Sequence, residues 1–392
     1  MSASEAARHL YVHVPFCEHR CGYCDFVTAV GRRGQHGAYV DALLGELELQ
    51  SSLLDHDLET VYIGGGTPTF LEPGVLARLL GALPAADELT VEANPETLTP
   101  ELAELLAENG VNRVSLGAQT FQAPLLSTLE RRAGPQAIFA SVPMLRRAGL
   151  DNVSLDLIYG IPGQSVNDLA RDLECVLDLA PEHISAYELE AKPGTRFAHA
   201  YGDELQRQAN GLEHYMEQVT QTLQENGYSW YETANFSREE SDGGRDLRSR
   251  HNLGYWLAHD YVGIGVGAVS TVAQQRWTNQ PGLARYLAAA GVGELPPSTE
   301  ERIAPAVRLW EQAMMGLRLE DGVETRLVEP VLDPDGFERM TAGQLVACEG
   351  ERMRLTRRGR MLGGAVTLEL LLDPNELASP VQELHRMAAA TP

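Results

Sequence analysis

Two periodicities alternate along the first half of the chain. Short apolar runs such as 60–63 and 153–158 predict buried strands, and each is followed by apolar residues at helical spacing, as in 73–83 and 165–179. The six predicted strands are 9–15, 60–63, 88–92, 111–116, 153–158 and 183–190. Regular βα alternation favours an α/β fold with a parallel sheet closed or partly closed into a barrel.

The second half departs from this rhythm. A helix is predicted over 205–227, a strand over 228–236 and a Pro-containing linker over 291–300. A helix over 303–319 then precedes short alternating elements that are typical of a small winged-helix-like domain. The predicted parts are a barrel over 1–205, a barrel extension over 206–295, a winged-helix-like domain over 296–378 and a flexible tail over 379–392.

Polar residues and glycines follow the predicted strands where those strands end. They are Gly65, Gly66, Thr67, Glu92, Gln119 and Asp156. Because the loops at the carboxyl ends of barrel strands form one face, these residues are expected to share a site. Taken singly, each has a structural explanation as well, since glycines allow tight turns and carboxylates cap helices.

Three cysteines follow the first predicted strand with the spacing C-x3-C-x2-C. They are Cys17, Cys21 and Cys24. Three thiolates can hold three irons of a [4Fe–4S] cluster and leave the fourth iron open to a small molecule. The alternative is a zinc site with His13 or His19 as fourth ligand. Zinc motifs usually contain a second cysteine pair, and the sequence has none.

Composition narrows the class of protein. The 392 residues carry a formal net charge of −24 and a single lysine, which argues against a nucleic-acid partner. The five cysteines form no visible disulfide framework, so a reducing compartment is expected. No signal peptide and no apolar run of about 18 residues is evident, which together favour a cytoplasmic location.

Four stretches together resemble the radical S-adenosylmethionine (SAM) superfamily, in the branch of oxygen-independent coproporphyrinogen III oxidase and its relatives. They are the cysteine loop after 11–15, the Gly-Gly-Gly-Thr-Pro-Thr of 64–69, and residues 115–121 and 156–163. The resemblance implies a partial (β/α)6 TIM-like barrel in which SAM binds the open iron and is reduced to a deoxyadenosyl radical. It assigns to SAM the residues Tyr11, Tyr23, Gly65, Gly66, Thr67, Glu92, Gln119, Arg131 and Asp156.

Two sequence features distinguish the oxidase from the other members of this branch. The oxidase typically has the motif C-x3-C-x2-C-x-C and a long extension before its first strand. In this sequence Phe26 stands at the last position of the motif, and only a short segment precedes the first strand. His251-Asn252-x-x-Tyr255-Trp256 resembles the haem-binding motif of the HemW family of haem chaperones. An imidazole can ligate haem iron and aromatic rings can cover the porphyrin. The alternative is a hydrogen-bonded histidine among packed aromatics.

The resemblance implies a protein that binds haem and delivers it to acceptor apoproteins, with a [4Fe–4S] cluster and SAM as cofactors. It also implies an electron donor such as a flavodoxin or ferredoxin, and leaves a homodimer and a peripheral membrane contact open. Two alternatives stand beside it: oxidative decarboxylation of coproporphyrinogen III, and a zinc-stabilised barrel without redox chemistry. One departure concerns the substrate side, where Val269 replaces the histidine that relatives typically carry.

Overall fold

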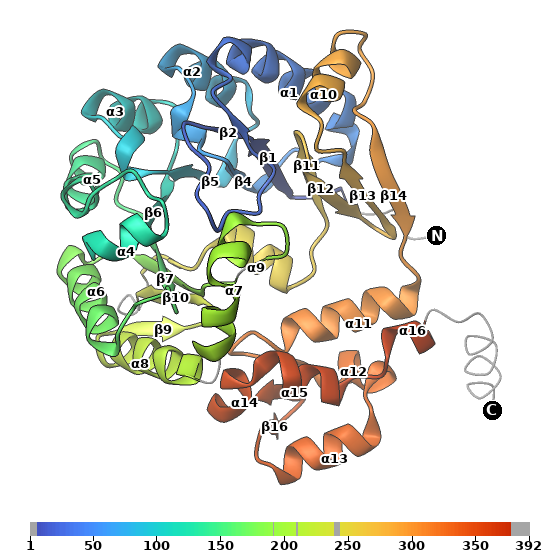
Figure 1. Ribbon diagram of the computed structural model, residues 1–392. Helices are drawn as coiled ribbons and strands as arrows, with labels where there is room; N and C mark the ends of the chain where they lie inside the picture. Colours follow the sequence, from blue (N-terminus) through green and yellow to red (C-terminus); the bar gives the residue numbers. More distant parts are fainter. Residues whose placement is uncertain (1–5, 191, 209–210, 239–243, 378–392) are drawn as a thin grey trace.

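The computed structural model describes residues 6–190, 192–208, 211–238 and 244–377, and its centre is a curved sheet of twelve strands (Figure 1). The strand order is β14-β13-β12-β11-β1-β4-β5-β6-β7-β8-β10-β9. The parallel neighbours at its centre are β1 (His9–Val14), β4 (Leu58–Gly65), β5 (Ala86–Ala93), β6 (Arg113–Gln119), β7 (Val153–Tyr159) and β8 (His183–Glu188). The predicted α/β fold with a partial barrel is thereby confirmed.

Helices form an arc outside these strands (Figure 1). They are α1 (His36–Gln50), α2 (Pro73–Ala82), α3 (Pro100–Glu108), α4 (Ala123–Thr128), α5 (Pro135–Arg147) and α6 (Val166–Leu179). Local signals set their ends: the Thr99 hydroxyl accepts from the backbone N–H of Leu102, and Ser165 forms a capping box with Asp168. The helices predicted over 73–83 and 165–179 agree with α2 and α6 to within one residue.

Three predictions beyond the barrel were wrong. The helix expected over 205–227 is two helices, α7 (Arg196–Gln208) and α8 (Leu212–Glu225). The strand expected over 228–236 is an antiparallel pair, β9 (Tyr228–Trp230) and β10 (Asn235–Arg238). The linker expected over 291–300 contains the start of β14 (Ser298–Arg302), an edge strand whose side chains are mostly exposed and therefore lack apolar alternation.

The antiparallel end of the sheet continues from β11 (Tyr261–Ile264), which is parallel to β1, through β12 (Val269–Val272) and β13 (Gln275–Asn279) to β14. Helix α10 (Leu283–Ala290) packs on α1. Two short strands, β2 (Phe16–Cys17) and β3 (Ala29–Val30), pair on either side of the cysteine loop and close it.

A second hydrophobic core lies beyond the sheet, among residues 306–377. Its helices are α11 (Pro305–Gly316), α12 (Thr325–Val328), α13 (Pro334–Ala342), α14 (Arg357–Met361), α15 (Gly363–Leu370) and α16 (Pro374–Leu377). They surround a small sheet of β15 (Val323–Glu324), β17 (Arg352–Leu355) and β16 (Val346–Glu349). The tail predicted over 379–392 lies outside the described residues. Among those described, no helix is both long and apolar enough to cross a bilayer.

Helix α9 (Arg250–Trp256) lies at the amino ends of the barrel strands, in contact with β4. The backbone N–H groups of Arg250 and His251 donate to the Glu88 carboxylate near the start of β5, over 3.1 and 3.2 Å. The ring of His251 lies 2.6 Å from the hydroxyl of Thr60, near the start of β4. These contacts aim His251 into the barrel.

Candidate cofactor-binding site

One large cavity of about 1030 Å³ runs through the barrel from the cysteine loop to α9. This volume is at the upper end of the ~300–1,000 Å³ typical of ligand sites. Its lining includes all three cysteines at one end and His251, Asn252 and Tyr255 at the other. The two groups of residues that the sequence assigned to different ligands therefore face the same space.

The three cysteines converge on the carboxyl ends of the strands. Cys17 ends β2 with its sulfur 3.7 Å from the Thr67 hydroxyl, and Arg131 Nη1 lies 3.8 Å from the sulfur of Cys21. Burial raises the pKa of Cys17 to about 11, a shift that a coordinated metal would reverse.

The spacing of the sulfur atoms bears on which metal group they fit. All three cysteines are described, and their sulfur atoms do not all lie within 4.8 Å of one another. Tetrahedral ligation of one zinc ion at ~2.3 Å would bring them to about 3.8 Å. Both histidines considered as zinc ligands are engaged as well: His13 Nε2 is 2.9 Å from the carbonyl oxygen of Val27, and His19 is 3.7 Å from the carboxylate of Glu130. The thiols as placed suit a polynuclear cluster better than one zinc ion.

The glycine stretch at the end of β4 is required by close packing. A Cβ on Gly65, whose φ is +110°, would lie 2.4 Å from the His13 ring, and one on Gly66 would lie 2.6 Å from the backbone carbon of Pro15. A side chain at either position would therefore push away the strand that leads into the cysteine loop. Both glycines and Thr67 also line the cavity, so the turn serves packing and ligand access together.

Two buried carboxylates stand beside this turn. Glu92 accepts from the Tyr62 hydroxyl at 2.8 Å and from the Gly65 N–H at 3.0 Å, and Asp156 accepts from the Ser115 hydroxyl at 3.1 Å. Burial raises the pKa of Glu92 to about 7 and that of Asp156 to about 6. At neutral pH Glu92 is therefore charged only in part, whereas Asp156 is mostly charged, and a cationic or hydroxyl-bearing ligand would favour the charged form of both.

Arg131 and Gln119 occupy the neighbouring strand end. Arg131 Nη2 donates to Asn94 Oδ1 over 2.6 Å and to the carbonyl oxygen of Gly117 over 3.0 Å. Gln119 has a φ of 65° at an irregularity in β6, which turns its side chain toward Gly117. Tyr23 lies edge-on to Phe197 at the rim. All of the residues predicted to bind SAM line the cavity.

His251 is held inside the cavity by contacts to both ring nitrogens. Its Nδ1 lies 2.6 Å from the Thr60 hydroxyl and its Nε2 lies 3.0 Å from the Tyr255 hydroxyl. The ring stacks on Tyr62 with centroids 5.0 Å apart. Burial lowers the pKa of His251 to about 3, so the imidazole is neutral at pH 7 and retains a lone pair for a metal.

The other residues of this motif differ in placement. Asn252 Nδ2 donates to Glu232 over 3.2 Å while its side chain lines the cavity. Trp256 is not part of the described cavity lining and packs against the guanidinium of Arg318, 5.6 Å from the ring centroid. Val269 lies on β12 and does not line the cavity either.

Arg113 is a cavity residue that the sequence analysis missed. It is 2% exposed, and its Nε has no hydrogen-bond partner among the described residues. Its positive charge partly opposes the rise that burial causes in the pKa of Glu92 and Asp156, and it adds to the lowering of the pKa of His251. Because an unpaired buried donor is costly, the N–H at Arg113 Nε is a candidate to donate to an acceptor on a bound ligand.

The cysteine-lined cavity in a partial barrel defines a radical SAM protein. The model of the radical SAM superfamily matches residues 11–176. Among solved structures, coproporphyrinogen III oxidase (HemN) from Escherichia coli superposes with a TM-score of 0.76 at 23% identity, covering 93% of this chain and 90% of that one. This likeness shows the fold. Superfamily membership implies a [4Fe–4S] cluster and SAM, which the converging thiols and buried carboxylates fit.

Sequence relatives narrow the assignment further. Proteins named "Heme chaperone HemW" are 34% identical in Lactococcus lactis, covering 93% of this chain and 97% of that protein, and 35% identical in Mycobacterium tuberculosis, covering 92% and 94%. The one from Escherichia coli K12 is 32% identical, covering 93% and 97%. The chain belongs to the HemW family.

Proposed function

We propose that the chain is a haem chaperone that binds haem in the barrel cavity and delivers it to acceptor proteins. The observation that carries this proposal is the position of His251, whose neutral imidazole is buried at the closed end of the cavity. Its Nε2 faces the side chain of Tyr255, which can rotate away, and not a fixed backbone group. The names of the family relatives support the same function.

The remaining cavity residues receive complementary roles in this proposal. Cys17, Cys21 and Cys24 hold the [4Fe–4S] cluster, and SAM occupies the carboxyl end of the cavity. The cluster and SAM supply one-electron reduction chemistry when bound. The SAM residues are those that line this end: Tyr11, Tyr23, Gly65, Gly66, Thr67, Glu92, Gln119, Arg131 and Asp156. Asn252 and Tyr255 contact haem beside His251, and Arg113 Nε donates to an acceptor on a bound ligand.

We infer further that the protein works in the cytoplasm with an electron donor such as a flavodoxin or ferredoxin. Cluster and SAM serve dimerisation or haem attachment in this scheme, and delivery to a membrane-bound acceptor would involve a peripheral contact with the membrane.

The test is a haem titration of the anaerobically reconstituted protein, followed by Soret absorbance. His251→Ala should lose the bound Soret band. The matched control is His183→Ala, because His183 is also a buried histidine of the cavity, 2.8 Å from both Ser154 Oγ and Tyr231 OH. Equal binding by wild type and His251→Ala, or loss only in His183→Ala, would refute the assignment.

A further inference from the structure

The amino end of the barrel carries a second cluster of ligating side chains. His9 begins β1, Glu59 lies near the start of β4 and His259 precedes β11. These strands are parallel neighbours, and the register pairs His9 with both Thr60 and Tyr261. The two histidines and the carboxylate therefore meet although up to 250 residues separate them in the chain.

Their geometry approaches that of a metal site. His9 Nε2 lies 3.0 Å from His259 Nδ1 and 3.9 Å from Glu59 Oε2. All three ligand atoms lie within 4.8 Å of one another. Two nitrogens on one zinc ion at ~2.0–2.1 Å are about 3.3 Å apart, close to the 3.0 Å that separates the two histidine nitrogens.

The surroundings of each ligand supply what a bound metal requires. His9 Nδ1 lies 2.9 Å from the Thr60 hydroxyl, which leaves Nε2 for the metal. The other oxygen of Glu59 pairs with Arg8 at 2.5 Å. Such outer partners orient ligands in metal sites.

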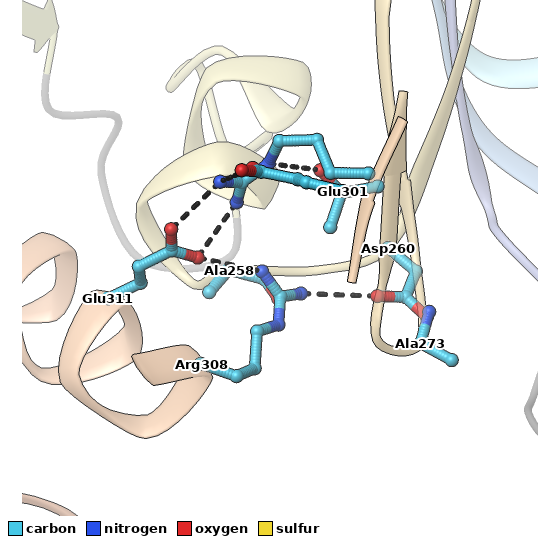
Figure 2. Close-up of polar contacts among 8 residues, drawn as sticks. Ala258, Asp260, Ala273, Glu301, Arg308 and Glu311 are labelled. Carbon is cyan, nitrogen blue, oxygen red and sulfur yellow. Dashed lines mark hydrogen bonds and ion pairs between the residues drawn. The ribbon is translucent and has the colours of Figure 1, made fainter. Parts of the chain in front are cut away.

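The residues around His9 and His259 leave room beside one ring and hold the other in place. A Cβ on Gly254 would lie 2.9 Å from His9 Nε2, so a side chain there would crowd this nitrogen. His259 is exposed, and the residues on both sides of it are clamped (Figure 2). Arg308 of α11 donates to the Ala258 carbonyl over 2.7 Å and to Asp260 over 3.1 Å.

We propose that His9, Glu59 and His259 form a binding site for a divalent transition metal of the zinc class, distinct from the cysteine cluster and open to solvent at its fourth position. Imidazole and carboxylate ligands suit zinc, nickel and copper, whereas the thiolates at the other end suit iron–sulfur clusters. The metal site uses none of the side chains that the proposed function assigns to haem, so its existence is tested separately from the proposed function.

The test is equilibrium dialysis of the cluster-loaded protein against micromolar zinc, followed by metal analysis. Loading the cluster first occupies the three thiols, which would otherwise bind zinc themselves. The wild type should retain one zinc per chain. His259→Ala should raise the dissociation constant at least tenfold, and Glu59→Gln should weaken binding in the same direction.

His214→Ala is the matched control, because His214 is an exposed histidine on α8 outside the cluster, and it should bind like the wild type. His259 is exposed, so its replacement should leave the fold intact, which circular dichroism checks. Absence of stoichiometric zinc in the wild type, or equal retention by His259→Ala, overturns the proposal and leaves His9 and His259 as a hydrogen-bonded pair.

Discussion

The two ends of the barrel strands use different chemistry on the same framework. At the carboxyl ends lie soft thiolates, glycines and buried carboxylates around the wide part of the cavity. At the amino ends, His9 lies within hydrogen-bonding distance of His259 and of Thr60, Thr60 also contacts His251 of α9, and Glu59 lies 3.9 Å from His9. The contrast teaches that loops form the site at the carboxyl ends of the strands. At the amino ends, the site is formed by helix α9 and by the first residues of the strands.

The largest expected effect separates the two ends completely. Replacing Cys17, Cys21 and Cys24 together by alanine should abolish iron and sulfide binding, because no other thiol in the described residues lines the cavity. Zinc retention through His259 should persist. Iron, sulfide and zinc analysis of anaerobically prepared protein checks both. Iron and sulfide at wild-type levels in this variant would place the cluster elsewhere.

A smaller effect concerns stability at the carboxyl end. The folded-state pKa of Glu92 is raised to about 7 from 4.5 by burial, so the folded protein binds a proton more tightly than the unfolded chain does. Stability from this group is complete below pH 4.5 and is lost as the pH rises through 7. Glu92→Gln should therefore increase the free energy of unfolding of the SAM-free protein at pH 8 by about 1–3 kcal/mol, with little change at pH 4.5.

Denaturant unfolding at the two pH values measures this difference, and SAM affinity should fall in the same variant. Glu101→Gln is the control, because this exposed glutamate at the start of α3 has a lowered pKa and its replacement should not stabilise. If Glu92→Gln and the wild type have the same free energy of unfolding at pH 8, the charged form of Glu92 does not destabilise the folded protein.

The zinc site and His251, both at the amino ends of the strands, are also expected to communicate through Thr60, whose hydroxyl lies 2.9 Å from His9 Nδ1 and 2.6 Å from His251 Nδ1. One hydroxyl proton cannot be donated to both nitrogens. When zinc binds His9 Nε2, the ring proton of His9 stays on Nδ1 and is donated to the Thr60 hydroxyl. Thr60 then donates its own proton to His251 Nδ1. The ring proton of His251 is therefore on Nε2. Iron needs the lone pair on His251 Nε2, which this proton occupies. Saturating zinc should therefore weaken haem binding about tenfold, which corresponds to the free energy of roughly one hydrogen bond.

Haem titrations with and without zinc measure this coupling. Thr60→Val removes the shared hydroxyl and should make haem affinity insensitive to zinc. A zinc effect of equal size in Thr60→Val would show that the coupling runs by another route. This prediction depends on both the haem assignment and the zinc site.

The smallest effect sharpens the role of Tyr255. Its hydroxyl lies 3.0 Å from the nitrogen that would bind iron, so Tyr255→Phe frees this nitrogen and keeps the ring. Haem affinity should rise about threefold, since one modest hydrogen bond no longer competes. Soret titration measures the change. A loss of affinity in Tyr255→Phe would show instead that the hydroxyl contacts haem or its ligands.

The sequence was informative where each element carries its own signal. The βα units of the barrel were predictable because their strands are continuous apolar runs and their helices have caps such as Thr99 and Ser165. The edge strand β14 was missed because its polar sequence, Ser298–Arg302, has no apolar alternation. The break between α7 and α8 was missed because amphipathic spacing alone does not fix where a helix ends.

The same distinction holds for the site. The cysteines and strand-end residues are local motifs, and the cavity brings them together as expected. Arg113 was overlooked because a charged residue at the start of a strand usually lies at the surface, and only the fold shows that it is buried. The meeting of His9 with His259 depends on strand register across 250 residues, which no local pattern encodes.

The central claim is that His251 ligates haem iron inside the barrel. The most direct measurement is electron–nuclear double resonance on ferric haem bound to protein labelled with ¹⁵N-histidine. A histidine nitrogen coupling is predicted in the wild type and in His183→Ala, and should disappear in His251→Ala. Persistence of the same coupling in His251→Ala would contradict the account.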